Sequence, residues 1–369
     1  MKDFTYWDRL YKNEQLEEFS QDLVGLLWLK IKSIIRVELI KGFLSFSNLE
    51  LKTEKQTDNF RALFEMLSID VQNSHILLDR YIIKINTEQI KTVNTEQLVS
   101  ELYKLKNFEW GGDYQNSLDK YLIRRHVKVR NSSYDYLISK FKTEINPAVQ
   151  AYVLNSWYNY WSSILIENIF KSHPIVLPTV GKIKSVDFFI NNIPFDLKVT
   201  YLPAEYIKQK RKEKQFPVEL TFLKQRAKIA KIDYDTKAKP IDIFYEITEK
   251  MKDINDDFCY QTLQKLQNEK NEILKEAQAN PKMLAKWLYE NQGEMRFGSE
   301  NRIFLILVDS IDFNNSWKLK RNTNLLKPII NAYLDNFKNQ NMEDLQISFT
   351  YKGKSREFTT LTDVIFVLK

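Results

Sequence analysis

The chain has 369 residues, of which 43% are hydrophobic and 28% are charged, as in a folded protein with one or two cores. This composition excludes disordered, collagen-like and coiled-coil proteins. It contains only eight glycines, three histidines and one cysteine. The glycines form no G-x-G-x-x-G turn for a dinucleotide, and a single cysteine excludes an internal disulfide and a thiolate zinc site.

Positive charge is concentrated in one segment. The formal net charge is +7, and residues 201–240 hold eleven Lys or Arg against five Asp or Glu, so they carry +6 of it. Such a segment favours an anionic partner, and a solvated helix face is the alternative. We take the following side chains as candidate DNA contacts: Lys208, Lys210, Arg211, Lys212, Lys224, Arg226 and Arg296.

Residues 1–145 are predicted to be mainly helical, because apolar side chains recur there at spacings of three and four. Residues 75–85 alternate and are predicted to form a short strand or hairpin. The first residues lack a long apolar stretch, and the longest apolar run, residues 303–308, is far too short to span a membrane. We therefore expect a cytoplasmic protein with no membrane partner.

Residues 146–369 show the alternation of helices and strands that is typical of an α/β domain. Predicted helices cover residues 146–170, 256–291 (interrupted at 280–281) and 325–337, and predicted strands cover residues 176–202, 302–309 and 363–368, with a hairpin around Gly353. Because residues 302–309 are almost all apolar, we expect them to form a strand that is covered on both faces at the centre of an α/β sheet. We therefore predict a mainly helical N-terminal domain at 1–145 and an α/β domain at 146–369.

The most informative segment surrounds Asn191-Asn192. This dipeptide tolerates positive φ angles and favours a two-residue hairpin turn between the strand-like runs on either side. Residue numbers of cross-strand partners then sum to 383, which sets Asp187 opposite Asp196. Alternation along the strands assigns Phe189, both carboxylates and Lys198 to one face, and an entirely apolar set to the core face.

Two directly opposed carboxylates destabilise a strand pair unless a raised pKa or a cation compensates for them. Mg²⁺ accepts one or two carboxylates and keeps water in its other positions. It would polarise a phosphoryl oxygen, while Lys198 orients or activates the attacking water. Glu167 lies within an apolar helical stretch and is a third acidic candidate. The alternative is an exposed hairpin face with a chance Asp, Asp and Lys.

Glu167, Asp187 and the run Asp196-Leu197-Lys198 resemble the PD-(D/E)xK nuclease superfamily and, within it, the type II restriction endonucleases. The resemblance covers roughly residues 146–310. It implies a restriction-endonuclease-like mixed central sheet flanked by helices, and Mg²⁺-dependent cleavage of DNA with Mn²⁺ as a substitute. It implies that Asp187, Asp196 and the Leu197 carbonyl bind metal and that Lys198 assists the attacking water, while Glu167 binds a second metal or positions Lys198. Val186 replaces the motif's proline, and Asp196 replaces the commoner Glu.

The expected function is that of a type II site-specific deoxyribonuclease acting on double-stranded DNA. Cutting both strands requires two active sites, so we expect a homodimer. A restriction enzyme also implies a cognate DNA methyltransferase that acts on the same site. Two alternatives stay open: a repair or mobile-element nuclease on the same scaffold, and a basic DNA-binding protein without cleavage activity.

Overall fold

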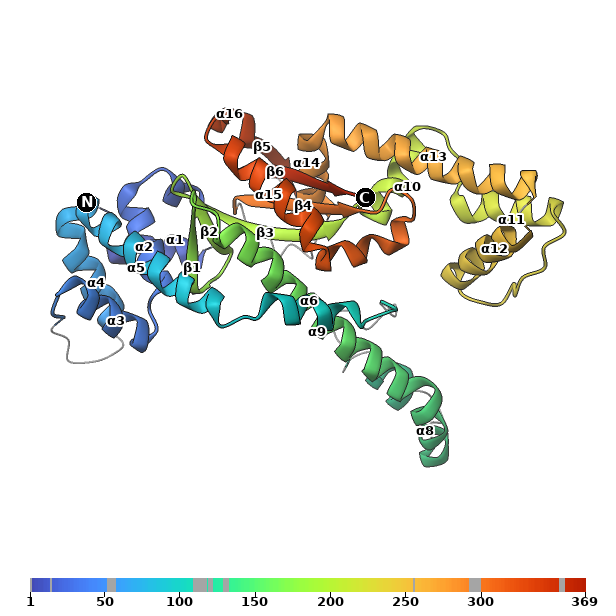
Figure 1. The fold of residues 1–369 in the computed structure, drawn as a ribbon, viewed down its shortest axis with the longest axis horizontal. Coiled ribbons are helices and arrows are strands. Elements are labelled where there is room, and N and C mark those ends of the chain that lie inside the picture. Colours follow the sequence, from blue (N-terminus) through green and yellow to red (C-terminus); the bar gives the residue numbers. More distant parts are fainter. Residues whose placement is uncertain are drawn as a thin grey trace. The chain divides into compact units, whose positions relative to one another are not determined.

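The structure is a computed structural model, and it describes residues 2–13, 15–51, 58–108, 118, 122–128, 133–254, 256–291, 300–351 and 356–369. The fold is mixed α/β, with a six-stranded mixed sheet in the order β1-β2-β3-β4-β6-β5 (Figure 1). Two compact units make up the chain, residues 1–197 with 317–340 and residues 198–316 with 341–369. The predicted boundary between residues 145 and 146 does not coincide with this division.

Helices form most of the first unit. They are α1 (Phe4–Lys12), α2 (Leu23–Ser33), α3 (Val37–Ser47), α4 (Asn59–Leu67), α5 (Val71–Lys91), α6 (Thr95–Tyr103), α8 (Tyr134–Lys140), α9 (Asn146–Lys171) and α15 (Thr323–Phe337). Short 3₁₀ helices lie at Glu17–Ser20 and Ser68–Asp70, and π-helical turns at Ile123–Val127 and Phe141–Ile145. No helix among the described residues is long and apolar enough to cross a membrane.

The prediction of a strand or hairpin at residues 75–85 is wrong, because these residues lie inside α5. Asp70 caps the helix by accepting a hydrogen bond from the Asn73 N–H at 3.1 Å. The buried residues Leu78, Tyr81 and Ile82 follow the spacing of three and four that places side chains on one helical face. The apolar residues in this stretch therefore fit a helical period as well as the alternation that suggested a strand.

The first unit contains a three-stranded antiparallel meander made of β1 (Val176–Ile183), β2 (Val186–Ile190) and β3 (Ile193–Tyr201). Asn191 and Asn192 have φ angles of 49° and 63°, as the predicted hairpin turn requires. Phe188 is opposite Phe195 and Ile190 is opposite Ile193, which confirms the predicted register. β3 continues past the end of the first unit, since residues 198–201 belong to the second.

The hairpin is covered on both faces near its turn. Phe188 stacks on Phe170 of α9 with ring centroids 5.2 Å apart, and Phe195 meets Phe337 of α15 edge to face at 5.9 Å. Phe189, on the opposite face, is also buried and joins the core formed by the N-terminal helices. The assignment of the core to one face alone is therefore wrong close to the turn, because N-terminal helices also pack on the face that carries Phe189.

A buried lysine ties the hairpin turn to the N-terminal helices. Lys30 of α2 is fully buried, and its ammonium group lies 2.7 Å from the Asp79 carboxylate of α5. The same group donates to the Asn192 side-chain oxygen at 3.1 Å. β1 also approaches α2 closely, since a side chain at Gly181 would meet the Ser33 carbonyl oxygen. The N-terminal helices and the hairpin therefore form one packed body.

The second unit combines strands with a group of helices. Its elements are α10 (Ala204–Glu213), α11 (Glu219–Ile229), α12 (Pro240–Ile254), α13 (Asp257–Ala279), α14 (Pro281–Asn291), β4 (Arg302–Val308), α16 (Met342–Leu345), β5 (Gln346–Thr350) and β6 (Glu357–Leu368). A 3₁₀ helix at Phe313–Arg321 contributes to both units.

The central strand of the second unit matches its prediction. Every residue of β4 is buried, and β4 pairs with β6 in parallel while β5 pairs with β6 antiparallel. The helical stretch is interrupted between Ala279 and Pro281, as predicted. The last strand begins at Glu357, earlier than predicted, and the predicted hairpin around Gly353 lies outside the described residues.

Candidate active site

Two strand carboxylates lie at the open end of the hairpin. Asp187 on β2 and Asp196 on β3 are the residues directly beyond Phe188 and Phe195, the last pair for which the register is established. The Leu197 N–H donates to a side-chain oxygen of Asp187 at 2.8 Å, and this bond holds that carboxylate toward β3. The Thr179 hydroxyl of β1 donates to the Asp187 backbone carbonyl at 2.8 Å and fixes the strand from the other side.

The surroundings of Asp187 shift its pKa. Burial, and next the negative charge of Asp196, raise the pKa of Asp187 from 3.8 to about 7. Glu167 raises this pKa too, whereas the Leu197 N–H and the ammonium of Lys171 lower it. Two carboxylates and one lysine of the first unit therefore act on the Asp187 carboxylate. At neutral pH, Asp187 holds a proton far more readily than an ordinary aspartate does.

Glu167 and Lys171 form an ion pair on the last turns of α9. They are four residues apart, with the lysine nitrogen 3.0 Å from a carboxylate oxygen, and their side chains are 28% and 15% exposed. Phe170 fixes this end of the helix by stacking on Phe188. We did not select Lys171 from the sequence, although the Glu-to-Lys spacing of four was a signal for it.

Replacing Lys171 by Met is expected to raise the pKa of Asp187 further, because the substitution removes a cation that favours the charged carboxylate. Titration of the Asp187 carboxyl carbon by NMR measures this directly. Lys171→Arg keeps the charge and is expected to leave the pKa close to that of the wild type. An unchanged pKa in Lys171→Met would contradict the assignment of Lys171 to this site.

The strand carboxylates suit a hard divalent cation that binds few protein ligands. Among the described residues, no group of three or more His, Cys, Asp and Glu side chains is placed to hold a metal ion. Of the expected metal ligands, Glu167 forms an ion pair with Lys171 on α9, whereas Asp187, Asp196 and the Leu197 carbonyl belong to the hairpin strands. Two carboxylates with water in the remaining positions are a coordination that Mg²⁺ accepts. Lys198 follows two residues after Asp196 on β3, and strand alternation directs both to the same side.

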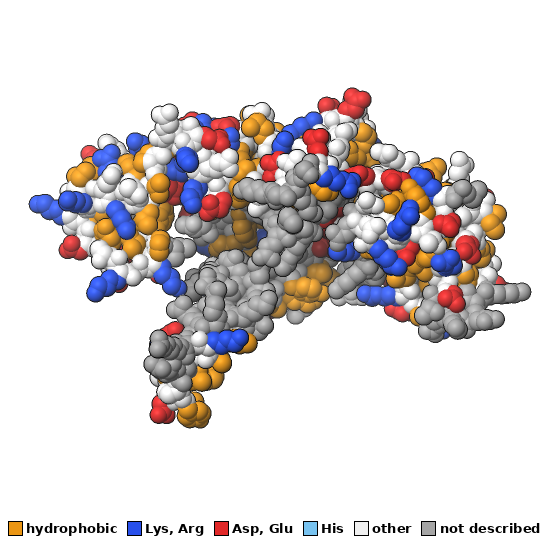
Figure 2. Space-filling model, turned by 180° about the vertical axis from the view of Figure 1, so that it is seen from behind, with side chains coloured by type: hydrophobic (Ala, Val, Ile, Leu, Met, Phe, Trp, Pro, Cys, Tyr) orange, Lys and Arg blue, Asp and Glu red, His pale blue; other side chains and the backbone are white. Residues whose placement is uncertain are grey.

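Part of the basic segment, residues 201–240, is buried inside the second unit. Lys210 and Arg211 of α10 are buried. Arg211 lies 2.7 Å from Glu269 and Lys210 lies 3.0 Å from Glu276, both on α13. These two side chains hold α10 against α13, so we do not assign them to DNA contact. On the face in Figure 2, the basic and acidic side chains of the described residues are interspersed.

The other candidate DNA contacts differ in exposure. Lys208 and Lys212 are exposed on α10. Lys224 and Arg226 of α11 are half-buried against aromatic rings, and the Arg226 guanidinium lies 5.1 Å from the ring centroid of Phe222. Arg296 lies outside the described residues. Lys208 and Lys212 are therefore the candidates best placed to meet a phosphate.

Replacing Arg211 by Met is expected to lower the free energy of unfolding by about 3 kcal/mol, because Glu269 would keep a buried charge without its partner. The neighbouring, exposed Lys212 is the matched control, and Lys212→Met should change stability by less than about 0.5 kcal/mol. Urea denaturation of both variants tests this. Equal effects would contradict the distinction between the two side chains.

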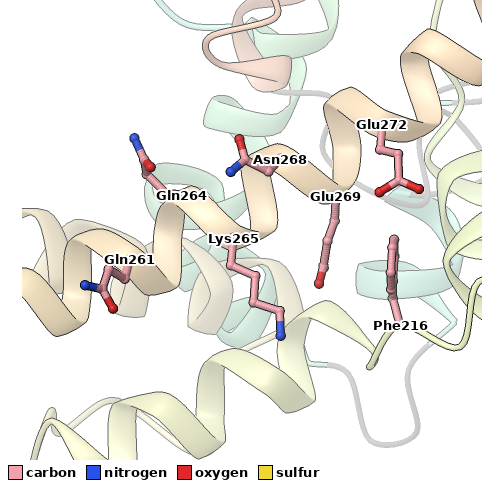
Figure 3. A pocket seen from close by; sticks show the side chains of 7 residues that line it. All are labelled: Phe216, Gln261, Gln264, Lys265, Asn268, Glu269 and Glu272. Atoms are coloured by element: carbon pink, nitrogen blue, oxygen red, sulfur yellow. The ribbon is translucent and has the colours of Figure 1, made fainter.

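A shallow depression lies on α13 beside Phe216 (Figure 3). Its volume is about 380 Å³, and its lining includes Lys265, Glu269 and Glu272. None of the predicted catalytic residues lines it. We therefore assign no chemistry to this depression.

No protein-family model, curated protein or solved structure matches the chain. What the site can do chemically follows from its own residues. Two neighbouring carboxylates on a hairpin, with the Lys171 ammonium on the adjoining helix of the same unit, can bind a divalent cation.

Proposed function

We propose that this chain is a Mg²⁺-dependent endonuclease that hydrolyses phosphodiester bonds of double-stranded DNA on a restriction-endonuclease-like scaffold. The observation that carries the proposal is the nearness of Asp187 and Asp196 on paired strands, because the charge of Asp196 contributes to raising the pKa of Asp187 to about 7. A carboxylate pair of this kind costs stability unless a cation compensates for it. The order of Asp187 and Asp196-Leu197-Lys198 in the sequence resembles the PD-(D/E)xK pattern.

Asp187 and Asp196 would hold Mg²⁺, which when bound polarises a phosphoryl oxygen and lowers the pKa of a bound water. Leu197 holds the Asp187 carboxylate in place through its N–H, so little reorganisation is needed on binding. Lys198 extends to the same side of β3 as Asp196 and would stabilise negative charge on the scissile phosphate.

Lys171 reduces the negative charge that an anion would meet at the site. Glu167, Asp187 and Asp196 together would repel a phosphate, and the ammonium of Lys171 offsets one of these charges at a distance of 3.0 Å from Glu167. Lys171 does not contact the reacting atoms in this account. It is a positioning residue that acts through Glu167 and through the pKa of Asp187.

DNA is the substrate that this arrangement suits best, because its backbone supplies the phosphodiester and because Lys208 and Lys212 remain exposed. The specific form of the proposal is a type II restriction enzyme that acts in the cytoplasm as a homodimer. A cognate methyltransferase would then protect the same sites in host DNA.

Digestion of unmethylated phage DNA by the wild-type protein, with sequencing of the ends, tests the proposal. With Mg²⁺ or Mn²⁺ we expect discrete fragments whose ends share one short sequence. Fragments with random ends would support nuclease activity but contradict site-specific restriction. Intact DNA with both metals, over a range of DNA substrates and protein concentrations, would contradict nuclease activity.

A further inference from the structure

Helices α11 and α13 of the second unit carry cations that no carboxylate neutralises. Their acidic residues Glu219, Glu269, Glu272 and Glu276 each form an ion pair. Among the described residues, five cations of these helices form none, against one acidic residue in the same state, Asp257. The five cations are Lys224, Arg226, Lys228, Lys265 and Lys275. The two helices therefore carry an excess of uncompensated positive charge.

Two of these cations lie against the same aromatic ring. The Arg226 guanidinium is 5.1 Å from the ring centroid of Phe222 and 5.3 Å from that of Phe258, and the Lys265 ammonium is 5.3 Å from the centroid of Phe222. Within the described part of the chain, Arg226 donates no hydrogen bond. Lys208 is more exposed, but it already forms an ion pair on its own helix. Stacking thus holds the Arg226 cation in place and leaves its N–H donors for another molecule.

Three amide side chains continue this surface along α13 (Figure 3). Gln261, Gln264 and Asn268 are exposed and line the depression on this helix together with Lys265. Gln261 and Asn268 form no side-chain hydrogen bond with the described residues, and Gln264 donates one to a neighbouring tyrosine. We call these three amides, with the cations Arg226 and Lys265, the α11–α13 surface.

The carboxylates that line the depression are already compensated. Glu269 pairs with Arg211 at 2.7 Å, and Glu272 pairs with Lys214 at 3.0 Å. Asp257 lies in the first turn of α13, at one end of the row of amides. An anion that approaches the amides therefore meets no uncompensated carboxylate between them.

We propose that the α11–α13 surface binds duplex DNA, with its cations on phosphates and its amides on base edges in the major groove. The choice of DNA rests on the proposed function. An amide side chain carries both a donor and an acceptor and suits the edge of an adenine, while arginine and lysine bind phosphate oxygens. Gln261 and Asn268 are about 10 Å apart along the helix, roughly three base-pair steps of 3.4 Å.

Fluorescence anisotropy of a labelled duplex, in EDTA and over a range of KCl concentrations, tests the phosphate contacts. We expect Arg226→Gln with Lys265→Gln to raise the dissociation constant at least ten-fold at about 100 mM KCl. The slope of log affinity against log salt should become shallower by about 1.8, because each phosphate contact contributes about 0.9.

Lys252→Gln with Lys286→Gln is the matched control, since it removes the same charge from two exposed lysines of this unit that already form ion pairs. It should change the slope by less than about 0.5. Circular dichroism establishes that both double variants are folded. Equal slopes in the two double variants would overturn the proposal.

Selection from a library of random duplexes, also in EDTA, tests the amides. The wild type should enrich one short sequence. Gln261→Ala with Asn268→Ala should lower the preference at two positions of that sequence at least five-fold, because a bidentate amide contact discriminates against the other bases. Gln278→Ala, at an exposed amide farther along α13, should leave the sequence unchanged. The wild-type sequence in Gln261→Ala with Asn268→Ala, or no enrichment by the wild type, would overturn the proposal.

These measurements report binding rather than cleavage. Altered binding by the variants, with DNA left intact in Mg²⁺ and Mn²⁺, would support the α11–α13 surface and contradict nuclease activity. Cleavage by the wild type, with unchanged binding by the variants, would support nuclease activity and overturn the assignment of the surface.

Discussion

Asp196→Asn is expected to reduce Mg²⁺-dependent DNA cleavage about 10³-fold, because the loss of a metal ligand removes several kcal/mol of transition-state stabilisation. The substitution keeps the size and polarity of the side chain, so the hairpin register and the core around Phe188 and Phe195 should be retained. Initial rates on a supercoiled plasmid, measured with excess enzyme, give the factor directly.

DNA binding by Asp196→Asn should equal or exceed that of the wild type, since one negative charge is removed from the site. Fluorescence anisotropy of a labelled duplex in EDTA measures this. Asp344→Asn, at an exposed position of the second unit, is the control and should leave both cleavage and binding unchanged. Retained cleavage in Asp196→Asn would show that the hairpin carboxylates are not the catalytic site.

Asp187→Asn is expected to stabilise the metal-free protein increasingly as the pH rises. The pKa of Asp187 is raised from 3.8 to about 7 in the folded protein, so the folded state holds a proton that the unfolded state releases near pH 4. The wild type therefore loses stability as the pH rises from about 4 through about 7. Asn stays neutral throughout and avoids this loss of stability. At 1.36 kcal/mol per pKa unit, the loss reaches about 4 kcal/mol.

Urea unfolding at pH 4.5 and at pH 8, in EDTA, checks this expectation. The free energies of unfolding should be similar at the lower pH, and the variant should be the more stable protein at the higher pH. A given concentration of Mg²⁺ should then stabilise the wild type more than Asp187→Asn, because the variant has lost one of the two carboxylate ligands and binds the cation more weakly. A variant that is less stable than the wild type at pH 8 would contradict the raised pKa.

The hairpin could be predicted in detail from the sequence. The Asn191-Asn192 turn and the unbroken alternation on either side fix the register, because a slip of one residue would turn every apolar side chain to the wrong face. β4 could be predicted for a similar reason, since a run of apolar residues of strand length is buried on both faces.

Other features depend on contacts between residues that are far apart in the sequence, and a local sequence pattern does not contain these contacts. Lys210 and Arg211 stand in a basic run, yet they are buried because α13, more than fifty residues later, presents Glu269 and Glu276 to them. Phe189 is buried because N-terminal helices cover its face of the hairpin. The same packing places residues 146–197 in one compact unit with the N-terminal helices.

Calorimetric titration with Mg²⁺ in buffers of different ionisation enthalpy tests most directly whether the carboxylate pair is a metal site. Because the pKa of Asp187 is about 7, binding of one Mg²⁺ should release about half a proton at pH 7, nearly one at pH 6 and almost none at pH 8.5. Asp187→Asn should bind more weakly and release no proton. The absence of saturable binding by the wild type, or the same proton release in Asp187→Asn, would contradict the account.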